Sequence, residues 1–296
     1  MTAMEGQSLR ADLHLHSRWS DGSLPIPALL ELAKRLGLGC VAITDHDTLA
    51  GQPQAAAAAQ DLGIHLIVGL EISAFDPDTG RKVHILGYGI RDARRVEDTL
   101  APYRQDRHRA MERAVELLAQ AGYPIGLEVV APYIGEGGIL YRQQIMHALM
   151  DRGYALSVYD PLYRKLFKNG GIAQVQSSYL PALEAVELVR GCGGRAVLAH
   201  PFEYDSMDLL PALVEAGLEG IECYHPSQTP QRQRALPRAH RHRWPRTAGD
   251  RRAPSRANPG ESSPTRRSGR TIPQLCTRKA RSRSAKKRPI SPPAAR

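Results

Sequence analysis

Cysteine is scarce in this sequence, and no two cysteines are close enough to form a CxxC pair. Their scattered spacing argues against a disulfide framework or a zinc knuckle and is typical of a reducing compartment. The chain also lacks an apolar stretch of membrane-spanning length, and residues 1–10 contain no apolar core of a signal peptide. We therefore expect a cytoplasmic protein with no membrane partner. The cysteines are Cys40, Cys192, Cys223 and Cys276.

Acidic residues are almost missing from the last part of the chain. Residues 1–228 hold 20 of the 40 Lys and Arg and 28 of the 30 Asp and Glu, a net charge of −8. Residues 229–296 hold the other 20 basic residues and only 2 acidic ones, a net charge of +18. This segment is also poor in branched aliphatic residues, so it cannot bury a core. We expect a folded part up to residue 228 and a disordered basic tail, residues 229–296.

Strand and helix patterns alternate along residues 9–228. Repeated βα units predict an α/β protein with a mainly parallel sheet, either a barrel or a doubly wound sheet. Residues 92–174 show helical patterns only, so we interpret them as an insertion between an N-terminal part, residues 9–91, and a C-terminal part, residues 175–228. The predicted strands are 11–16, 39–44, 64–73, 82–90, 194–200 and 220–224, and the predicted helices outside the insertion are 26–36, 49–62, 180–191 and 205–216.

The first predicted strand carries a His-x-His pattern. Because side chains alternate between the two faces of a strand, Asp12, His14 and His16 share one face and the leucines between them share the other. Two imidazoles separated by one residue can bind the same metal ion, and the carboxylate of Asp21 follows on a turn. A single His-x-His is more often structural than a ligand pair, so this pattern alone identifies no site.

Further candidate ligands lie in or just after other apolar strands, which makes coincidence a poor explanation. Because the carboxyl ends of parallel strands meet at one edge of a sheet, these side chains should converge there. A buried charge such as that of Glu71 is also costly without a cation or a partner. Imidazole and carboxylate ligands without thiolates suit Mn, Fe or Zn. The further candidates are Asp45, His46, Asp47, Glu71, His84 and His200.

Taken in order, these motifs resemble those of the PHP (polymerase and histidinol phosphatase) family of metal-dependent phosphoesterases. The resemblance covers about residues 9–228 and includes Ser20-Asp21-Gly22, Gly69-x-Glu71 and His200-Pro201. It implies a distorted (β/α)7 barrel that holds two or three divalent metal ions, with Mn first and Fe or Zn as alternatives. It also implies catalytic metal ligands at His14, His16, Asp21, His46, Glu71, His84 and His200.

Four more residues near these motifs are candidates for orienting the ligands. Asp45 and Asp47 flank His46, and Asp12 shares the strand face of the His-x-His pair. Such carboxylates commonly accept a hydrogen bond from a ligand histidine and so fix its ring. His225, at the end of the last predicted strand, is a weaker candidate at the rim of the pocket.

The helical insertion resembles that of nucleoside 3′,5′-bisphosphate phosphatases, some of which also act as 5′→3′ exoribonucleases. The resemblance implies that a metal-activated water hydrolyses a phosphorylated nucleotide or RNA. Arg142 matches an arginine that helps to hold the phosphate, although Gln144 stands where the family has a histidine. Arg104 and Arg107, three residues apart on a predicted helix, could clamp a second phosphate. The alternative for this pair is a solvated helix face.

The sequence departs from the family after about residue 228. The family continues with a strand and a Ser-Asp-x-His-Gly motif that supplies two more ligands, whereas Asp250, the only Asp of the tail, is followed by Arg251. We therefore expect that the last βα unit is lost, and our hypothesis is a shifted reading frame. The alternative is a genuine basic arm that contacts nucleic acid nonspecifically. In that case the chain could be a catalytically impaired remnant with a nucleic-acid-binding tail.

Overall fold

The computed structural model describes residues 10–226, 229 and 231. The predictions of a disordered or frame-shifted tail, of a lost βα unit and of nucleic-acid contact through the tail all fall outside the described residues. The domain boundaries stay predictions as well.

One sheet carries the strand ends at which the candidate ligands lie. Its strands follow the order β1-β2-β3-β4-β6-β7, and β5 pairs with β3 beside this path. Every strand expected from the apolar runs is present, with ends that differ by a few residues. The strands are β1 (Ala11–Leu15), β2 (Cys40–Ile43), β3 (His65–Phe75), β4 (Lys82–Tyr88), β5 (Leu180–Pro181), β6 (Arg195–Leu198) and β7 (Gly220–Ile221).

The direction of β4 departs from a simple series of βα units. β1, β2 and β3 run parallel, and so do β6 and β7, but β4 is antiparallel to both β3 and β6. The reason is that β3 and β4 are joined by a tight turn, in which Asp76 accepts the N–H of Gly80 through its carbonyl at 2.8 Å. In this hairpin His84 is paired with Ser73, so it lies in the middle of a strand rather than at a strand end.

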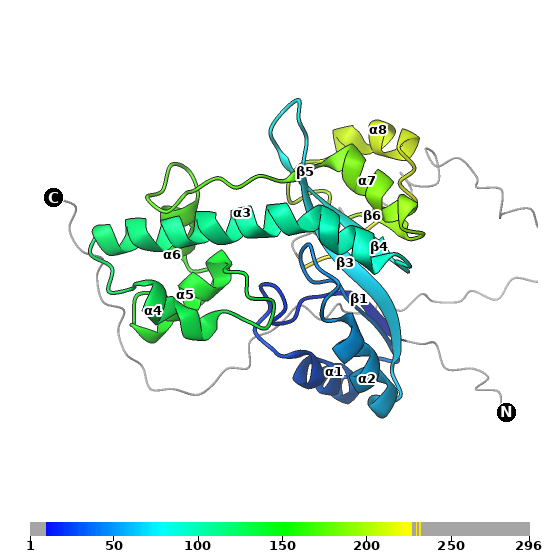
Figure 1. The fold of residues 1–296 in the computed structure, drawn as a ribbon, viewed down its shortest axis with the longest axis horizontal. Helices are drawn as coiled ribbons and strands as arrows, with labels where there is room; N and C mark the ends of the chain where they lie inside the picture. Colours follow the sequence, from blue (N-terminus) through cyan, green and yellow to red (C-terminus); the bar gives the residue numbers. More distant parts are fainter. Residues whose placement is uncertain (1–9, 227–228, 230, 232–296) are drawn as a thin grey trace, which may run out of the picture.

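Helices outside the insertion pack against the sheet through apolar faces. α1 and α2 contact each other beside β1 and β2, and α7 and α8 lie near β4 and β6 (Figure 1). All four match helices expected from the 3.6-residue period, although the last is shorter and begins with a 3₁₀ turn, Met207–Leu209. The helices are α1 (Ile26–Arg35), α2 (Gln52–Leu62), α7 (Ala182–Gly191) and α8 (Leu210–Glu215).

Between β4 and β5 the named elements are helical, as the sequence predicts. α3 (Ala93–Gln120) is long and runs from the sheet to a group of short helices at its far end (Figure 1). Leu100 of α3 belongs to the core around the sheet, whereas Leu118 belongs to a second core among the short helices. The short helices are α4 (Leu127–Val130), a 3₁₀ turn (Ala131–Tyr133), α5 (Arg142–Asp151) and α6 (Pro161–Phe167).

Within the described residues, no helix combines the length and the apolar character needed to cross a membrane. Even α3, which has 28 residues, carries charged side chains along its length.

The second core gives a stability prediction. Leu118 is fully buried there, so Leu118→Ala should lower the free energy of unfolding by about 2–5 kcal/mol, through lost transfer energy and the cavity left behind. Leu127→Ala, at a side chain that is 41% exposed, is the matched control and should cost far less. Urea denaturation followed by circular dichroism measures both. Equal midpoints for the two variants would contradict the packing described here.

Candidate metal centre

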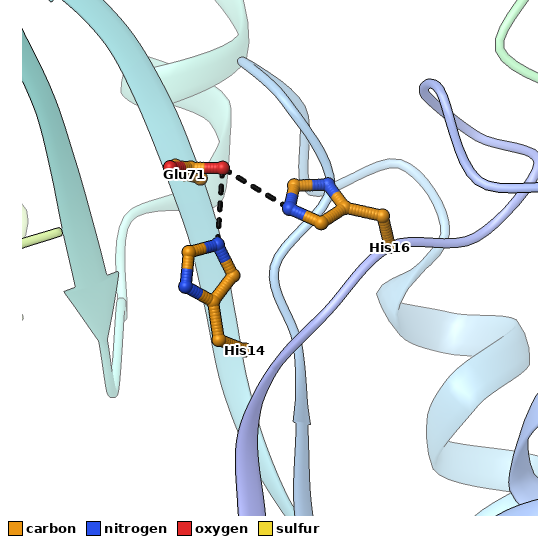
Figure 2. Close-up of side chains that lie close together, drawn as sticks. All are labelled: His14, His16 and Glu71. Atoms are coloured by element: carbon orange, nitrogen blue, oxygen red, sulfur yellow. Dashed lines mark ion pairs between the residues drawn. The ribbon is translucent and has the colours of Figure 1, made fainter. Parts of the chain in front are cut away.

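The carboxylate of Glu71 is the centre of a cluster of imidazoles. Its Oε2 lies 3.1 Å from Nε2 of His14 and 3.0 Å from Nε2 of His16. Figure 2 shows both rings directed at this carboxylate. Its Oε1 lies 2.8 Å from Nδ1 of His84 and 2.7 Å from Nε2 of His200. The Glu71 side chain is almost completely buried. Four histidines that are far apart in the sequence therefore meet at one charged group.

The sheet explains why these side chains converge. His14 lies on β1, one residue before its end, and His16 follows two residues later on the same face. His46 follows β2 and forms an isolated parallel bridge with Glu71, so its ring lies above β3, with Nδ1 3.5 Å from Glu71 Oε2. His200 follows β6. Apolar residues of these strands are buried in the core, and the candidate ligands lie together at one edge of the sheet.

A second ligand group lies beside the first. Asp21 Oδ1 is 3.4 Å from His16 Nδ1, and Asp21 Oδ2 is 3.9 Å from His46 Nε2. Gly22 allows the tight turn that places Asp21, because a Cβ there would lie 2.3 Å from the carbonyl oxygen of His16. Among the described residues, four sets have potential ligand atoms within 4.8 Å of one another: His14, His16 and Glu71; His14, Glu222 and His225; His16, Asp21 and His46; His46, Glu71 and His84.

Electrostatics act in opposite directions on the histidines of the cluster. Burial would lower the pKa of His14, His16 and His200, but the neighbouring carboxylates outweigh it and raise these pKa values, so a cation would have to displace a proton there. Burial, opposed in part by Glu71 and Asp21, lowers the pKa of His46 to about 3, so this imidazole stays neutral and keeps a lone pair. Burial also lowers the pKa of His84. Burial would raise the pKa of Glu71, but the surrounding histidines outweigh it and hold that pKa well below its usual value. Neutral imidazoles with ionised carboxylates are a donor set for divalent cations, so these residues fit the metal ions that the sequence predicts.

The flanking aspartates support the ligand loops through hydrogen bonds. Asp45 accepts the N–H of Ser17 at 2.7 Å and the hydroxyls of Ser17 and Ser20, each at 2.6 Å. It therefore holds the turn that leads to Asp21. Asp12 accepts the N–H of His14 at 3.2 Å. Asp45 and Asp12 contact the backbone beside the ligands, which is consistent with the predicted orienting role.

Asp47 connects the metal centre to the insertion. It accepts the N–H of Ser73 at 2.7 Å and the guanidinium of Arg107 at 2.6 Å. Arg107 is only 7% exposed, so the alternative of a solvated helix face is wrong for this residue. Arg104 donates to the carbonyl of Asp47 at 2.6 Å and pairs with Glu97 at 2.8 Å. Arg104 thus supports the backbone of Asp47, whose φ of 58° is unusual for a residue other than glycine.

Arg142 begins α5 beside the metal centre. One of its Nη atoms donates to the carbonyl of Val175 at 3.4 Å, and its buried Nε has no hydrogen-bond partner. Gln144, at the position where the family has a histidine, accepts the N–H of Tyr141 at 2.7 Å and donates to the carbonyl of Ser20 at 3.1 Å. The glutamine therefore caps the helix and ties it to the turn before Asp21.

Two adjoining cavities open onto these groups. The larger, of about 860 Å³, is lined by the predicted ligands together with Tyr159, Tyr163 and Tyr204. The smaller, of about 100 Å³, reaches from His46 and His84 toward the insertion. Four basic side chains and the phenol of one tyrosine that line the smaller cavity are called the cationic subsite. They are Lys82, Arg107, Arg142, Lys168 and Tyr179. Arg104 is not among the lining residues of either cavity.

Sequence reasoning missed Glu222 and much of the cationic subsite. Glu222 follows β7 and lies 3.0 Å from Nδ1 of His14, and it belongs to a potential ligand group with His14 and His225. Glu222 lies within the predicted strand 220–224, and a carboxylate set in an apolar strand was the signal that could have found it, as it did for Glu71. Lys82 and Tyr179 carry no such local signal.

The fold and this donor set define a metal-binding α/β protein of the kind that gathers divalent cations at one edge of its sheet. The PHP domain profile matches residues 12–130. A relative from Eggerthella lenta, named phosphoribosyl 1,2-cyclic phosphate 1,2-diphosphodiesterase, is 42% identical over 219 residues, which cover 74% of this chain and 84% of the relative. The chain belongs to the PHP domain family.

Other relatives and a solved structure agree with this assignment. The 3′,5′-nucleoside bisphosphate phosphatase of Chromobacterium violaceum is 34% identical and covers 71% of this chain and 75% of its own length. The 5′-3′ exoribonuclease Rnm of Escherichia coli is 30% identical, and the match covers 81% of this chain and 84% of that protein. A crystal structure described as a metal-dependent phosphoesterase of Bifidobacterium adolescentis superposes with a TM-score of 0.73 at 30% identity, covering 80% of this chain and 85% of that one.

Removing the central carboxylate should remove the metal centre. We expect Glu71→Gln to weaken Mn²⁺ binding by more than the roughly 10–100-fold that loss of an outer-shell partner costs, because two ligand groups share this side chain. Isothermal titration calorimetry and metal content per chain measure the effect. Asp78→Asn, at an exposed position in the turn after β3, should bind metal like the wild type. Wild-type affinity in Glu71→Gln would contradict the proposed centre.

Proposed function

We propose that this chain hydrolyses a phosphate ester on a ribose that carries a second phosphate group. The substrate classes are 3′,5′-bisphosphate nucleotides and short RNA 5′ ends. Family membership and the names of the relatives support a metal-dependent phosphoesterase in general. The observation that carries the finer proposal is the cationic subsite, because its cavity shares Asp21, His46 and His84 with the cavity of the metal centre.

The cationic subsite contains more basic side chains than carboxylates that pair with them. Arg107 is paired with Asp47, but Lys82 donates to the phenol of Tyr179 at 3.0 Å, and Arg142 leaves its buried Nε without a partner. Burial lowers the pKa of Lys82, because a positive charge is costly in this environment. A phosphate dianion would supply both the counter-charge and the missing acceptor. The subsite therefore suits the phosphate that is not being cleaved.

The metal centre suits the phosphate that is cleaved. Bound divalent ions would supply an activated water and neutralise charge on the phosphate oxygens. Neutral imidazoles and the carboxylates of Glu71 and Asp21 would hold these ions, with Mn²⁺ as the first expectation and Fe or Zn as alternatives. Gln143 donates to Asp21 Oδ2 at 2.7 Å and so keeps that carboxylate turned toward His46. Protein groups thus position both ends of the substrate.

The relatives favour a substrate with two phosphates but differ in its form. One is named for nucleoside 3′,5′-bisphosphates, one for 5′-3′ cleavage of RNA, and one for a phosphoribosyl 1,2-cyclic phosphate. A second candidate substrate is therefore a cyclic phosphodiester of phosphoribose, which the relative with 42% identity supports. All three substrate classes present one phosphate for cleavage and another at a distance.

Release of inorganic phosphate from adenosine 3′,5′-bisphosphate tests the proposal. The parallel substrates are an RNA 5′ end, from which mononucleotides are released, and a phosphoribosyl cyclic phosphate, whose ring opens to a phosphomonoester. We expect Mn²⁺-dependent product formation by the full chain. The alternative of a catalytically impaired remnant predicts fewer than two tightly bound ions per chain and no product from any of the three. Release from a simple phosphomonoester only would contradict the requirement for a second phosphate.

The cationic subsite should bind the phosphate that is not cleaved and so lower KM for substrates that carry it. We expect Arg142→Met to raise KM for adenosine 3′,5′-bisphosphate by about 10–150-fold, because one or more charge-assisted hydrogen bonds are lost. Adenosine 3′-monophosphate, which lacks the second phosphate, should be a poor substrate of the wild type, and Arg142→Met should change its cleavage little. Arg109→Met, at an exposed arginine of α3, is the matched control. An equal loss on both substrates would contradict the assignment.

Tyr179 gives the subsite a pH dependence. Burial would raise its pKa, but Lys82 and Arg107 outweigh burial and lower the pKa to about 7. As pH rises through 7, the phenol becomes a phenolate, and its negative charge should repel a phosphate. We therefore expect KM for the bisphosphate to rise from pH 6 to pH 8 in the wild type and to change much less in Tyr179→Phe. Parallel pH profiles for the two proteins would contradict this role.

A further inference from the structure

Glu222 holds two of the proposed metal ligands at once. Its Oε1 lies 3.0 Å from Nδ1 of His14, and its Oε2 accepts the backbone N–H of His200 at 2.7 Å. The side chain is 9% exposed, so these contacts are largely shielded from water. Because His14 lies on β1, His200 follows β6 and Glu222 follows β7, one carboxylate connects three strand ends at the metal centre.

The contact with His14 selects which ring nitrogen carries the proton. An ionised carboxylate can only accept hydrogen bonds, so Glu222 favours a proton on Nδ1 of His14. The other ring nitrogen, Nε2, faces Glu71 Oε2 at 3.1 Å. With Nδ1 protonated, Nε2 is free to offer its lone pair to a cation shared with Glu71, which is the arrangement that carboxylate–histidine–metal sites use.

The contact with His200 acts on the backbone. His200 has a φ of 21°, a conformation that residues other than glycine rarely adopt. The hydrogen bond from its N–H to Glu222 helps to hold this conformation. In the same geometry Nε2 of His200 lies 2.7 Å from Oε1 of Glu71. The backbone strain at His200 is therefore connected to the direction in which its ring points.

We propose that Glu222 is a positioning residue of the metal centre, which fixes the tautomer of His14 and the backbone of His200. This inference rests on the metal centre proposed above. Glu222 could instead be a ligand itself, because it forms a potential ligand group with His14 and His225. The positioning role is favoured because each carboxylate oxygen already faces an N–H donor or a ring nitrogen of the ligand histidines.

Glu222→Gln is the decisive variant. The amide has one acceptor oxygen and one NH₂ donor, so it cannot accept from both His14 and His200. If the oxygen stays with His200, the NH₂ group donates to Nδ1 of His14 and drives the ring proton to Nε2, where it blocks metal binding. Glu222→Asp keeps a carboxylate and should lose less. Glu219→Gln changes a glutamate on the same segment that is paired with Arg195 outside the centre, and it serves as the matched control.

Two measurements on the full chain test the proposal. The first is the affinity for Mn²⁺ by calorimetry, which should fall about 10–100-fold in Glu222→Gln and stay unchanged in Glu219→Gln. The second is the ¹⁵N NMR spectrum of ring-labelled histidine in the zinc-loaded protein. We expect a protonated Nδ1 for His14 in the wild type and the loss of this signal in Glu222→Gln, with partial recovery in Glu222→Asp.

The outcomes separate this inference from the proposed function. If the wild type binds metal and cleaves bisphosphates but Glu222→Gln keeps both its affinity and the His14 signal, the positioning role is wrong and the function stands. Loss of one whole metal equivalent with an unchanged His14 signal would make Glu222 a ligand and would also overturn the positioning role. A wild type that binds no metal would overturn the centre and this inference together.

Discussion

The buried charge of Glu71 is the constraint on which the site depends. Moving a carboxylate out of water costs several kcal/mol even after the protein relaxes, so it must be matched by partners at short range. Here the match comes from imidazoles on separate segments, at 2.7–3.1 Å for His14, His16, His84 and His200. Because each segment follows or belongs to a different strand, the pairing of the strands and the geometry of the centre cannot vary independently. A change in strand register would move a histidine by one residue and turn it to the other face of the sheet.

The insertion contributes most of the cations of the subsite, and a buried ion pair helps to align it with the metal centre. Arg107 on α3 reaches Asp47 at 2.6 Å, and Asp47 also accepts the N–H of Ser73 on β3. Breaking a buried pair by removing one partner costs about 3–5 kcal/mol, since the remaining charge is left uncompensated. The Arg107–Asp47 pair thus makes the position of α3 depend on the loop that carries His46. A shift of α3 would therefore disturb the backbone that carries His46.

The sequence predicted those features that depend on local periodicity. Alternation along residues 11–16 placed His14 and His16 on one face, and apolar runs located the strands before His46 and His200. The antiparallel direction of β4 was not predicted. The apolar pattern of a strand is similar whether a short turn or a βα connection precedes it, so the pattern does not show the direction in which the strand runs. Glu222 was missed because its contact with His14 spans 208 residues, and its position in a predicted strand does not by itself show which side chain it contacts. Lys82 and Tyr179 form their pair across 97 residues for the same reason.

The charge balance of residues 1–228 makes the local arrangement of cations important. Residues 1–228 carry a net charge of −8, which by itself would repel a phosphorylated substrate. At physiological salt, however, exposed charges more than about 8 Å away are largely screened, whereas buried charges are screened much less. The substrate therefore responds mainly to what lines the cavity. There, Lys82, Arg142 and Lys168 face one end, and the ligand cluster that would hold divalent cations faces the other. An acidic protein can bind a polyanion when its cations are buried beside the reacting group and its acidic residues are exposed to solvent.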